Sequence, residues 1–130
     1  MTTMNAMKNA AGLLCLFVAL PATAESPQLD GKQIQELLTG NSAVYEDGAK
    51  QFFGENGKTT YMSKGRPVET GTWRAAESHY CSRWGVGGPG RGEACYVVRY
   101  DGETITFNGK YPGRIRTGDV FSNPPTGAIN

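Results

Sequence analysis

The sequence is poor in the side chains that build metal and redox sites. It contains a single histidine, His79, and three cysteines, no two of which stand in a C-x-x-C arrangement. Zinc sites take three or four ligands, chiefly histidine and cysteine, and thiol redox sites commonly use the C-x-x-C spacing. We therefore expect no metal site, no redox site and no cofactor.

An excess of either charge is also missing. The chain has 13 lysines and arginines against 12 aspartates and glutamates, and neither sign gathers in a run. Proteins that bind nucleic acid concentrate basic residues to contact the phosphates. The composition therefore argues against nucleic acid as a partner.

Long hydrophobic runs are absent as well. The apolar stretch at residues 10–20 is too short to cross a bilayer as a helix. Lys8 precedes it and Ala22-Thr23-Ala24 follows, which is the pattern of a secretory signal peptide with an A-x-A cleavage site. We predict a signal peptide over residues 1–24 and a mature domain over residues 25–130, periplasmic or secreted, with no membrane anchor.

Cys15 lies inside this apolar stretch, where a lipidated cysteine would anchor the protein to a membrane. The residue before it is Leu14, whereas lipoprotein processing requires a small residue there. We therefore interpret Cys15 as part of the signal peptide and expect no lipid anchor. Met1, Met4 and Met7 each offer a start for this peptide.

Two cysteines, Cys81 and Cys95, remain in the mature chain. An exported protein meets an oxidising compartment, where paired cysteines form disulfides. We expect Cys81 and Cys95 to form a structural disulfide that closes a loop of about 15 residues.

A short helix is predicted at residues 31–38. Asp30 and Gln33 are spaced as a capping box, and Leu29 and Ile34 as a hydrophobic staple. Gly40 is a natural stop. The helix must dock on a larger element, because so short a helix is marginal alone.

The rest of the chain, residues 43–121, reads as short strands separated by turn residues. Five dipeptides tolerate the positive φ of tight hairpins: Asp47-Gly48, Asn56-Gly57, Lys64-Gly65, Asp101-Gly102 and Asn108-Gly109. Consecutive hairpins without a crossover helix make an antiparallel meander. We predict an all-β fold of about eight strands curled into a small barrel, with the helix plugging one end and a flexible tail at residues 122–130. A two-layer sandwich is the alternative.

Three predicted hairpins agree on which side chains face inward. If Cys81 lies opposite Cys95, Arg83 lies opposite Glu93. A two-residue turn at 101–102 then places Val98 opposite Ile105, and one at 76–77 places Trp73 opposite Tyr80, which are compatible registers. The predicted core face comprises Trp73, Tyr80, Tyr96, Val98, Ile105 and Phe107, and the outer face His79, Cys81, Arg83, Cys95, Arg99 and Thr104. Because the inward side chains are bulky, we expect a filled interior.

Several short motifs occur in a recognisable order. Leu38-Thr39-Gly40-Asn41 precedes Gly71-Thr72-Trp73, Cys81 and Cys95-Tyr96. This pattern resembles a group of small exported proteins of Gram-negative bacteria with an LTGN…GTW…C…C signature and no assigned activity. The resemblance implies a periplasmic β-domain without catalytic residues to transfer. The Gly-Thr-Trp segment is also similar to that of lipocalins, but it lies mid-chain, so this likeness concerns fold style only.

The sequence favours a non-catalytic binding module, such as an inhibitor or envelope partner, over an enzyme. Trp84 and Arg91 flank the glycine-rich loop at residues 85–90, and Arg83 lies next to Trp84. Arginine and tryptophan commonly anchor interfaces. A protein or small ligand in the periplasm is the expected partner. The alternative is a small hydrolase that uses His79 or a pair of carboxylates.

Overall fold

The computed structural model describes residues 25–85 and 92–122. The predicted signal peptide and residues 123–130 of the predicted tail lie outside the described residues. Within the described part, the chain forms one helix and nine strands, in the order α1 (Gly31–Leu38), β1 (Asn41–Tyr45), β2 (Lys50–Phe53), β3 (Lys58–Met62), β4 (Glu69–Ala75), β5 (Tyr80–Trp84), β6 (Ala94–Tyr96), β7 (Val98–Tyr100), β8 (Ile105–Phe107) and β9 (Lys110–Thr117).

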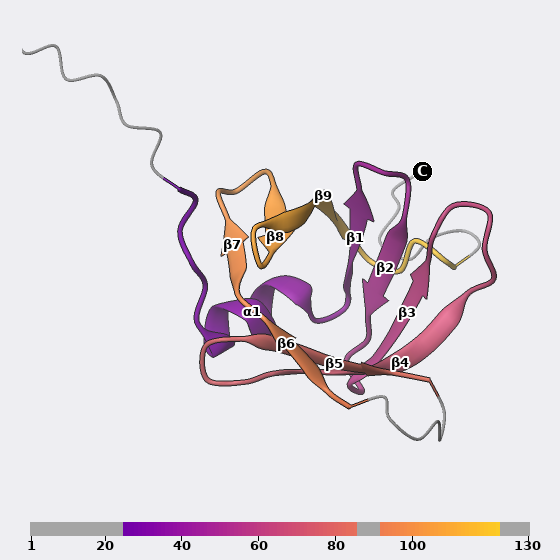
Figure 1. Cartoon of the computed structure of the whole chain (residues 1–130), viewed down its shortest axis with the longest axis horizontal. Helices are drawn as coiled ribbons and strands as arrows, with labels where there is room; N and C mark the ends of the chain where they lie inside the picture. Colours follow the sequence, from indigo (N-terminus) through magenta and orange to yellow (C-terminus); the bar gives the residue numbers. More distant parts are fainter. Residues whose placement is uncertain (1–24, 86–91, 123–130) are drawn as a thin grey trace, which may run out of the picture.

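The strands form one antiparallel sheet that curls into a nearly closed barrel (Figure 1). Their order across the sheet is β6-β5-β4-β3-β2-β1-β9-β8-β7. The two outermost strands, β6 and β7, follow each other directly in the chain, with only Val97 between them. The predicted all-β barrel with one short N-terminal helix is therefore confirmed, with nine strands instead of about eight.

The additional strand arises because the predicted strand at residues 93–100 breaks at Val97. Asn108 holds this corner: its backbone N–H donates to the Val97 carbonyl at 2.8 Å, and its side-chain oxygen accepts the Val97 N–H at 2.7 Å. Asn108 has a φ of 54°, which asparagine tolerates better than most residues. Because both polar backbone groups of Val97 are paired at the corner, the chain can leave one sheet edge and begin the other.

The segment before the helix covers the outer edge of β7. The Leu29 N–H donates to the Val98 carbonyl at 2.9 Å, and the Tyr100 N–H donates to the Pro27 carbonyl at 3.1 Å. Gln28 forms an isolated antiparallel bridge with Arg99. This strand-like cover satisfies an edge that would otherwise be open to pairing with another chain.

Helix α1 begins and ends as predicted. The Asp30 carboxylate accepts the Gln33 N–H at 2.8 Å, and the Gln33 side chain accepts the Asp30 N–H at 2.9 Å. Ile34 and Leu38 are fully buried in the core, so the apolar side of the helix is docked on the barrel. Gly40 follows with a φ of 77°.

The core fills the end of the barrel that the helix covers. The side chains buried there include Ile34, Leu38, Phe53, Trp73, Val98 and Ile105. Five of the six predicted core residues are buried, and the sixth, Tyr96, is half-buried and packs against them. In the described residues, no helix has both the length and the apolar character needed to cross a membrane.

Two predicted hairpin registers are wrong by two residues. Val98 lies opposite Phe107 instead of Ile105, because the loop after Tyr100 has four residues. Trp73 lies opposite Ser82 instead of Tyr80. A shift of two keeps every side chain on the same face of a strand, so the predicted core face survives both errors.

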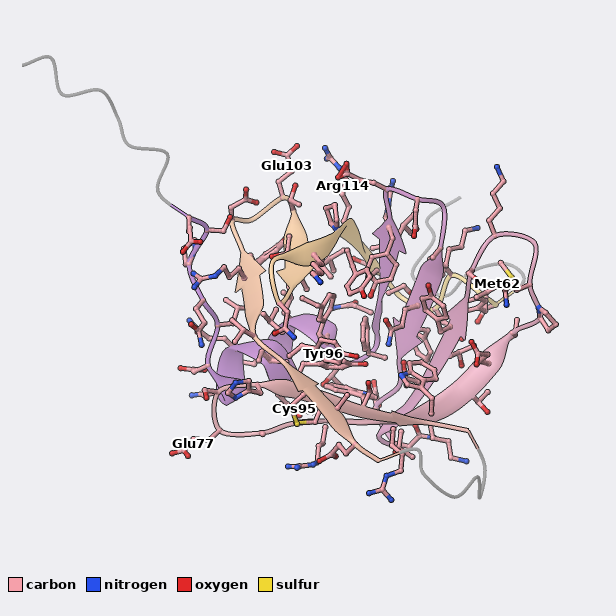
Figure 2. All side chains as sticks on the ribbon, in the orientation of Figure 1. Met62, Glu77, Cys95, Tyr96, Glu103 and Arg114 are labelled. Carbon is pink, nitrogen blue, oxygen red and sulfur yellow. A yellow bond between two sulfur atoms is a disulfide. The ribbon has the colours of Figure 1, made fainter. Side chains whose placement is uncertain are left out.

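The disulfide forms as predicted between Cys81 and Cys95, which lie opposite each other in β5 and β6. Figure 2 shows it on the side of β6 away from Tyr96. Cys81 is fully buried although it lies on the outer face. The predicted register of this pair is confirmed, with Ser82 opposite Ala94. Glu93, which precedes β6, forms its ion pair with Arg74 at 2.6 Å, and not with Arg83 as the register suggested.

Replacing both cysteines with alanine is expected to lower the free energy of unfolding by about 2 kcal/mol without changing the fold. Closing a loop of about 15 residues contributes at most about 3 kcal/mol in the chain-entropy model, and measured values commonly fall below it. Urea unfolding of the oxidised protein and the variant measures the difference. A reductant should bring the wild-type protein to the stability of the variant, and a variant that fails to fold would show that the bond does more than constrain the loop.

Candidate functional site

A pocket of about 330 Å³ opens into the barrel interior. Nearly every strand contributes to its wall, and most of the contributing side chains are aromatic. The described residues that line it are Tyr45, Asp47, Gln51, Tyr61, Glu69, Tyr80, Ser82, Trp84, Tyr96, Phe107 and Tyr111. The expectation of a wholly filled interior is therefore wrong at this end of the barrel.

Two glycines at wall positions keep side chains out of this space. A Cβ at Gly71 in β4 would lie 2.9 Å from the Trp84 ring and 2.3 Å from the Arg83 carbonyl oxygen. A Cβ at Gly113 in β9 would lie 3.0 Å from the Tyr45 ring. Because both positions lack a side chain, these two aromatic rings can approach the neighbouring strands closely, and the interior is left partly open.

A buried polar network forms the base of the pocket, with Gln51 at its centre. The Tyr45 hydroxyl donates to Gln51 Oε1 at 2.7 Å. Gln51 Nε2 donates to Thr59 Oγ1 at 3.0 Å and to the Tyr80 hydroxyl at 2.9 Å. Each of these side chains is buried, so their polar groups must be paired with one another to be tolerated.

Burial has a strong effect on the tyrosines of this network. It raises the pKa of Tyr80 to about 12, although hydrogen bonds with Ser82 and Gln51 act in the opposite direction. Burial likewise raises the pKa of Tyr45 well above its usual value, and the neighbouring Tyr80 adds to the effect. Both phenols are therefore neutral hydrogen-bonding groups at physiological pH and not bases.

The wall above the base is a continuous series of aromatic rings. Tyr61 and Trp84 have their ring centroids 5.9 Å apart, with the ring planes 66° apart. Tyr45 lies 6.4 Å from Tyr61 and 6.2 Å from Phe107. Such edge and tilted contacts hold the rings in place, and Trp84 is fixed further because its Nε1 donates to Ser82 Oγ at 3.1 Å.

Acidic groups stand at the mouth. Asp47 and Glu69 both line the pocket and are exposed. Burial, then the charges of Asp47 and Glu69, raise the pKa of the Tyr61 hydroxyl, so both carboxylates act on that group. The Asp47 carboxylate is oriented by its turn, where it accepts the Ala49 N–H at 2.9 Å.

Tyr111 completes the mouth in an unusual backbone conformation. Its φ is 55°, and the residue is 57% exposed. The pairing of β8 with β9 changes register here, since Ile105 lies opposite Gly113 but Phe107 lies opposite Lys110. A bulge of this kind changes the direction in which a side chain points. A tyrosine keeps the left-handed backbone conformation only where the surrounding structure enforces it.

The three predicted partner-binding residues do not share a surface in the described residues. Trp84 lines the pocket. Arg83 is exposed on the opposite face of β5, because neighbouring residues of a strand point to opposite sides. Arg91 lies outside the described residues.

The two arrangements predicted for a hydrolase, a histidine beside a serine and a pair of carboxylates, are each found only in part. His79 Nδ1 lies 3.1 Å from Ser78 Oγ in the connection between β4 and β5, but neither residue lines the pocket. Asp47 and Glu69 do line it, at its exposed mouth. A carboxylic acid that donates a proton in catalysis is usually held in an apolar environment, which these positions do not provide.

The group of potential metal ligands in the described residues comprises Cys81, Glu93 and Cys95. The two sulfur atoms are bonded to each other, and Glu93 pairs with Arg74. This group therefore has no thiolate to offer a metal while the disulfide is intact.

Comparison with known proteins gives no match: no family model, curated protein or solved structure corresponds to this chain.

Proposed function

We propose that this protein is a non-catalytic binding domain whose ligand is a small molecule held in the barrel pocket. One observation supports this most directly: a 330 Å³ space lined by seven aromatic side chains, with its buried polar groups paired among themselves. Ligand pockets are typically apolar concavities of this size with a few fixed polar groups. In this proposal Trp84 contacts the ligand from inside the barrel.

A catalytic role is less well supported. The buried hydroxyls at the base are held neutral by burial, and the two carboxylates stand in solvent. His79 and Ser78 lie away from the pocket lining. Binding needs none of these groups to exchange protons, so the geometry favours it over the hydrolase alternative.

We place the domain in the periplasm or outside the cell. The predicted cleavage after Ala24 and the disulfide of Cys81 with Cys95 both fit an oxidising compartment. Mass spectrometry of the exported protein tests the proposal, since an N-terminus at Glu25 is expected.

Trp84→Ala is expected to weaken binding of a neutral, environment-sensitive fluorescent dye about tenfold, because a large aromatic wall is lost. The dye titration is run beside thermal unfolding, which should show a folded variant. Arg83→Ala is the matched control, since it alters the outer face of the same strand and should leave dye binding unchanged. Equal dye binding by folded Trp84→Ala and wild-type protein would contradict the proposed site.

A further inference from the structure

The charged side chains that line the pocket have one sign. Among the described residues that line it, Asp47 and Glu69 are acidic and none is lysine or arginine. Both carboxylates line the pocket and act on the hydroxyl of Tyr61, another lining residue. A cleft lined by one sign of charge concentrates ligands of the opposite sign. The entrance therefore favours a cation.

The aromatic wall suits a cation of a particular kind. Trp84, Tyr61 and Tyr45 follow one another around the wall with inclined ring planes. Aromatic faces attract cations through their quadrupole, most strongly for tryptophan and where water is excluded, and cages of such rings recognise quaternary ammonium groups. The wall can thus contact the apolar methyl groups and the charge of such a ligand at once.

The base of the pocket distinguishes a methylated ammonium from a primary one. Gln51 Oε1 already accepts from the Tyr45 hydroxyl, and the Thr59 and Tyr80 hydroxyl oxygens already accept from Gln51 Nε2, so the acceptor oxygens at the base are engaged within the protein. A primary ammonium carries three N–H donors that lose their water on entry and must find acceptors. A quaternary ammonium has no N–H group and avoids that loss.

We infer that the pocket binds small organic cations that carry a methylated, quaternary ammonium group, with the aromatic wall around the methyl groups and Asp47 and Glu69 supplying the opposite charge. This inference rests on the proposed function, since it specifies the ligand class of the same pocket.

Choline is a suitable probe, because two close analogues separate the contributions. Its neutral isostere carries a tert-butyl group in place of the trimethylammonium group and keeps the shape without the charge. Ethanolamine keeps the charge without the methyl groups. Calorimetric and NMR titrations of the oxidised mature protein should give choline an affinity at least about tenfold above either analogue. The choline affinity should also fall as salt is added, because exposed charges are screened.

Asp47→Asn combined with Glu69→Gln removes the charge at the mouth with little change in shape. This variant is expected to bind choline about tenfold more weakly and the neutral isostere equally well. Glu36→Gln, which removes an exposed charge from helix α1, is the control and should change neither affinity.

The outcomes separate the two proposals. If the neutral isostere binds as tightly as choline and displaces the dye, the pocket is a binding site but the cation inference is overturned. If ethanolamine binds as tightly as choline, the methylated class is wrong. If the dye itself does not depend on Trp84, the proposed function fails independently of any cation.

Discussion

Replacing Gly31 with alanine is expected to lower the free energy of unfolding by about 4 kcal/mol. A Cβ at this position would lie 1.9 Å from the Ala76 carbonyl oxygen, which belongs to the backbone and cannot rotate away. The Gly31 N–H also donates to the Glu77 carbonyl at 2.9 Å. Overpacking typically costs about 1–3 kcal/mol and a lost hydrogen bond about 1 kcal/mol, so helix α1 must move off the connection between β4 and β5.

Urea unfolding followed by circular dichroism measures this loss. Gly92→Ala is the matched control, because a Cβ there meets nothing within 4 Å and Gly92 is exposed. It should leave the stability within about 0.5 kcal/mol of wild type. If Gly31→Ala proves equally harmless, the helix does not pack on that backbone as closely as the structure has it.

The sequence could predict which side chains face inward, because side chains along a β-strand point to alternate faces with a period of two residues. The glycines of the five predicted turns all have positive φ, so the local turn chemistry was recognised correctly. The length of a loop is less constrained by its residues: the chain makes a four-residue loop after Tyr100, where the Asp101 carboxylate accepts the N–H groups of Glu103 and Thr104. Because this loop is two residues longer than predicted, the register shifts by two residues, but each side chain stays on its predicted face of the sheet.

The corner at Val97 could not be predicted from its own segment. Residues 93–100 are rich in β-branched and aromatic residues, and no glycine or proline marks a break among them. The break depends on Asn108, eleven residues further on, whose backbone and side chain bind both polar groups of Val97. A tertiary contact here overrides a local strand pattern, and it is this contact that lets the sheet close.

The pocket was missed for a related reason. Its inward side chains were predicted as a set of bulky residues, without the glycines on the strands opposite them. Gly71 was visible beside Trp73, two positions apart and so on the same face. A glycine at an inward strand position is a signal of close approach, and it could have indicated room for Trp84. The bulge that aims Tyr111 at the mouth has no such signal.

Alkaline pH is expected to destabilise the protein through the buried tyrosines at the base of the pocket. An unfolded tyrosine releases its proton near pH 10, whereas burial raises the pKa of Tyr80 in the folded protein to about 12. Below pH 10 both states are protonated and the stability is intact. Between pH 10 and 12 only the unfolded chain ionises at this residue, so the free energy of unfolding falls by about 1.4 kcal/mol per unit, or about 3 kcal/mol in all. Tyr45, whose pKa is also raised, adds to the loss.

Urea unfolding at a series of pH values, with tyrosinate absorbance recorded in parallel, measures this dependence. Tyr80→Phe should be somewhat less stable than wild type at neutral pH, because the Gln51 amide loses an acceptor. It should nevertheless lose less stability above pH 10, since the unfolded chain has one tyrosine fewer to ionise. The two stability curves therefore converge as the pH rises. Parallel curves would mean that Tyr80 ionises as readily in the folded protein as in the unfolded chain, and that water reaches the base of the pocket.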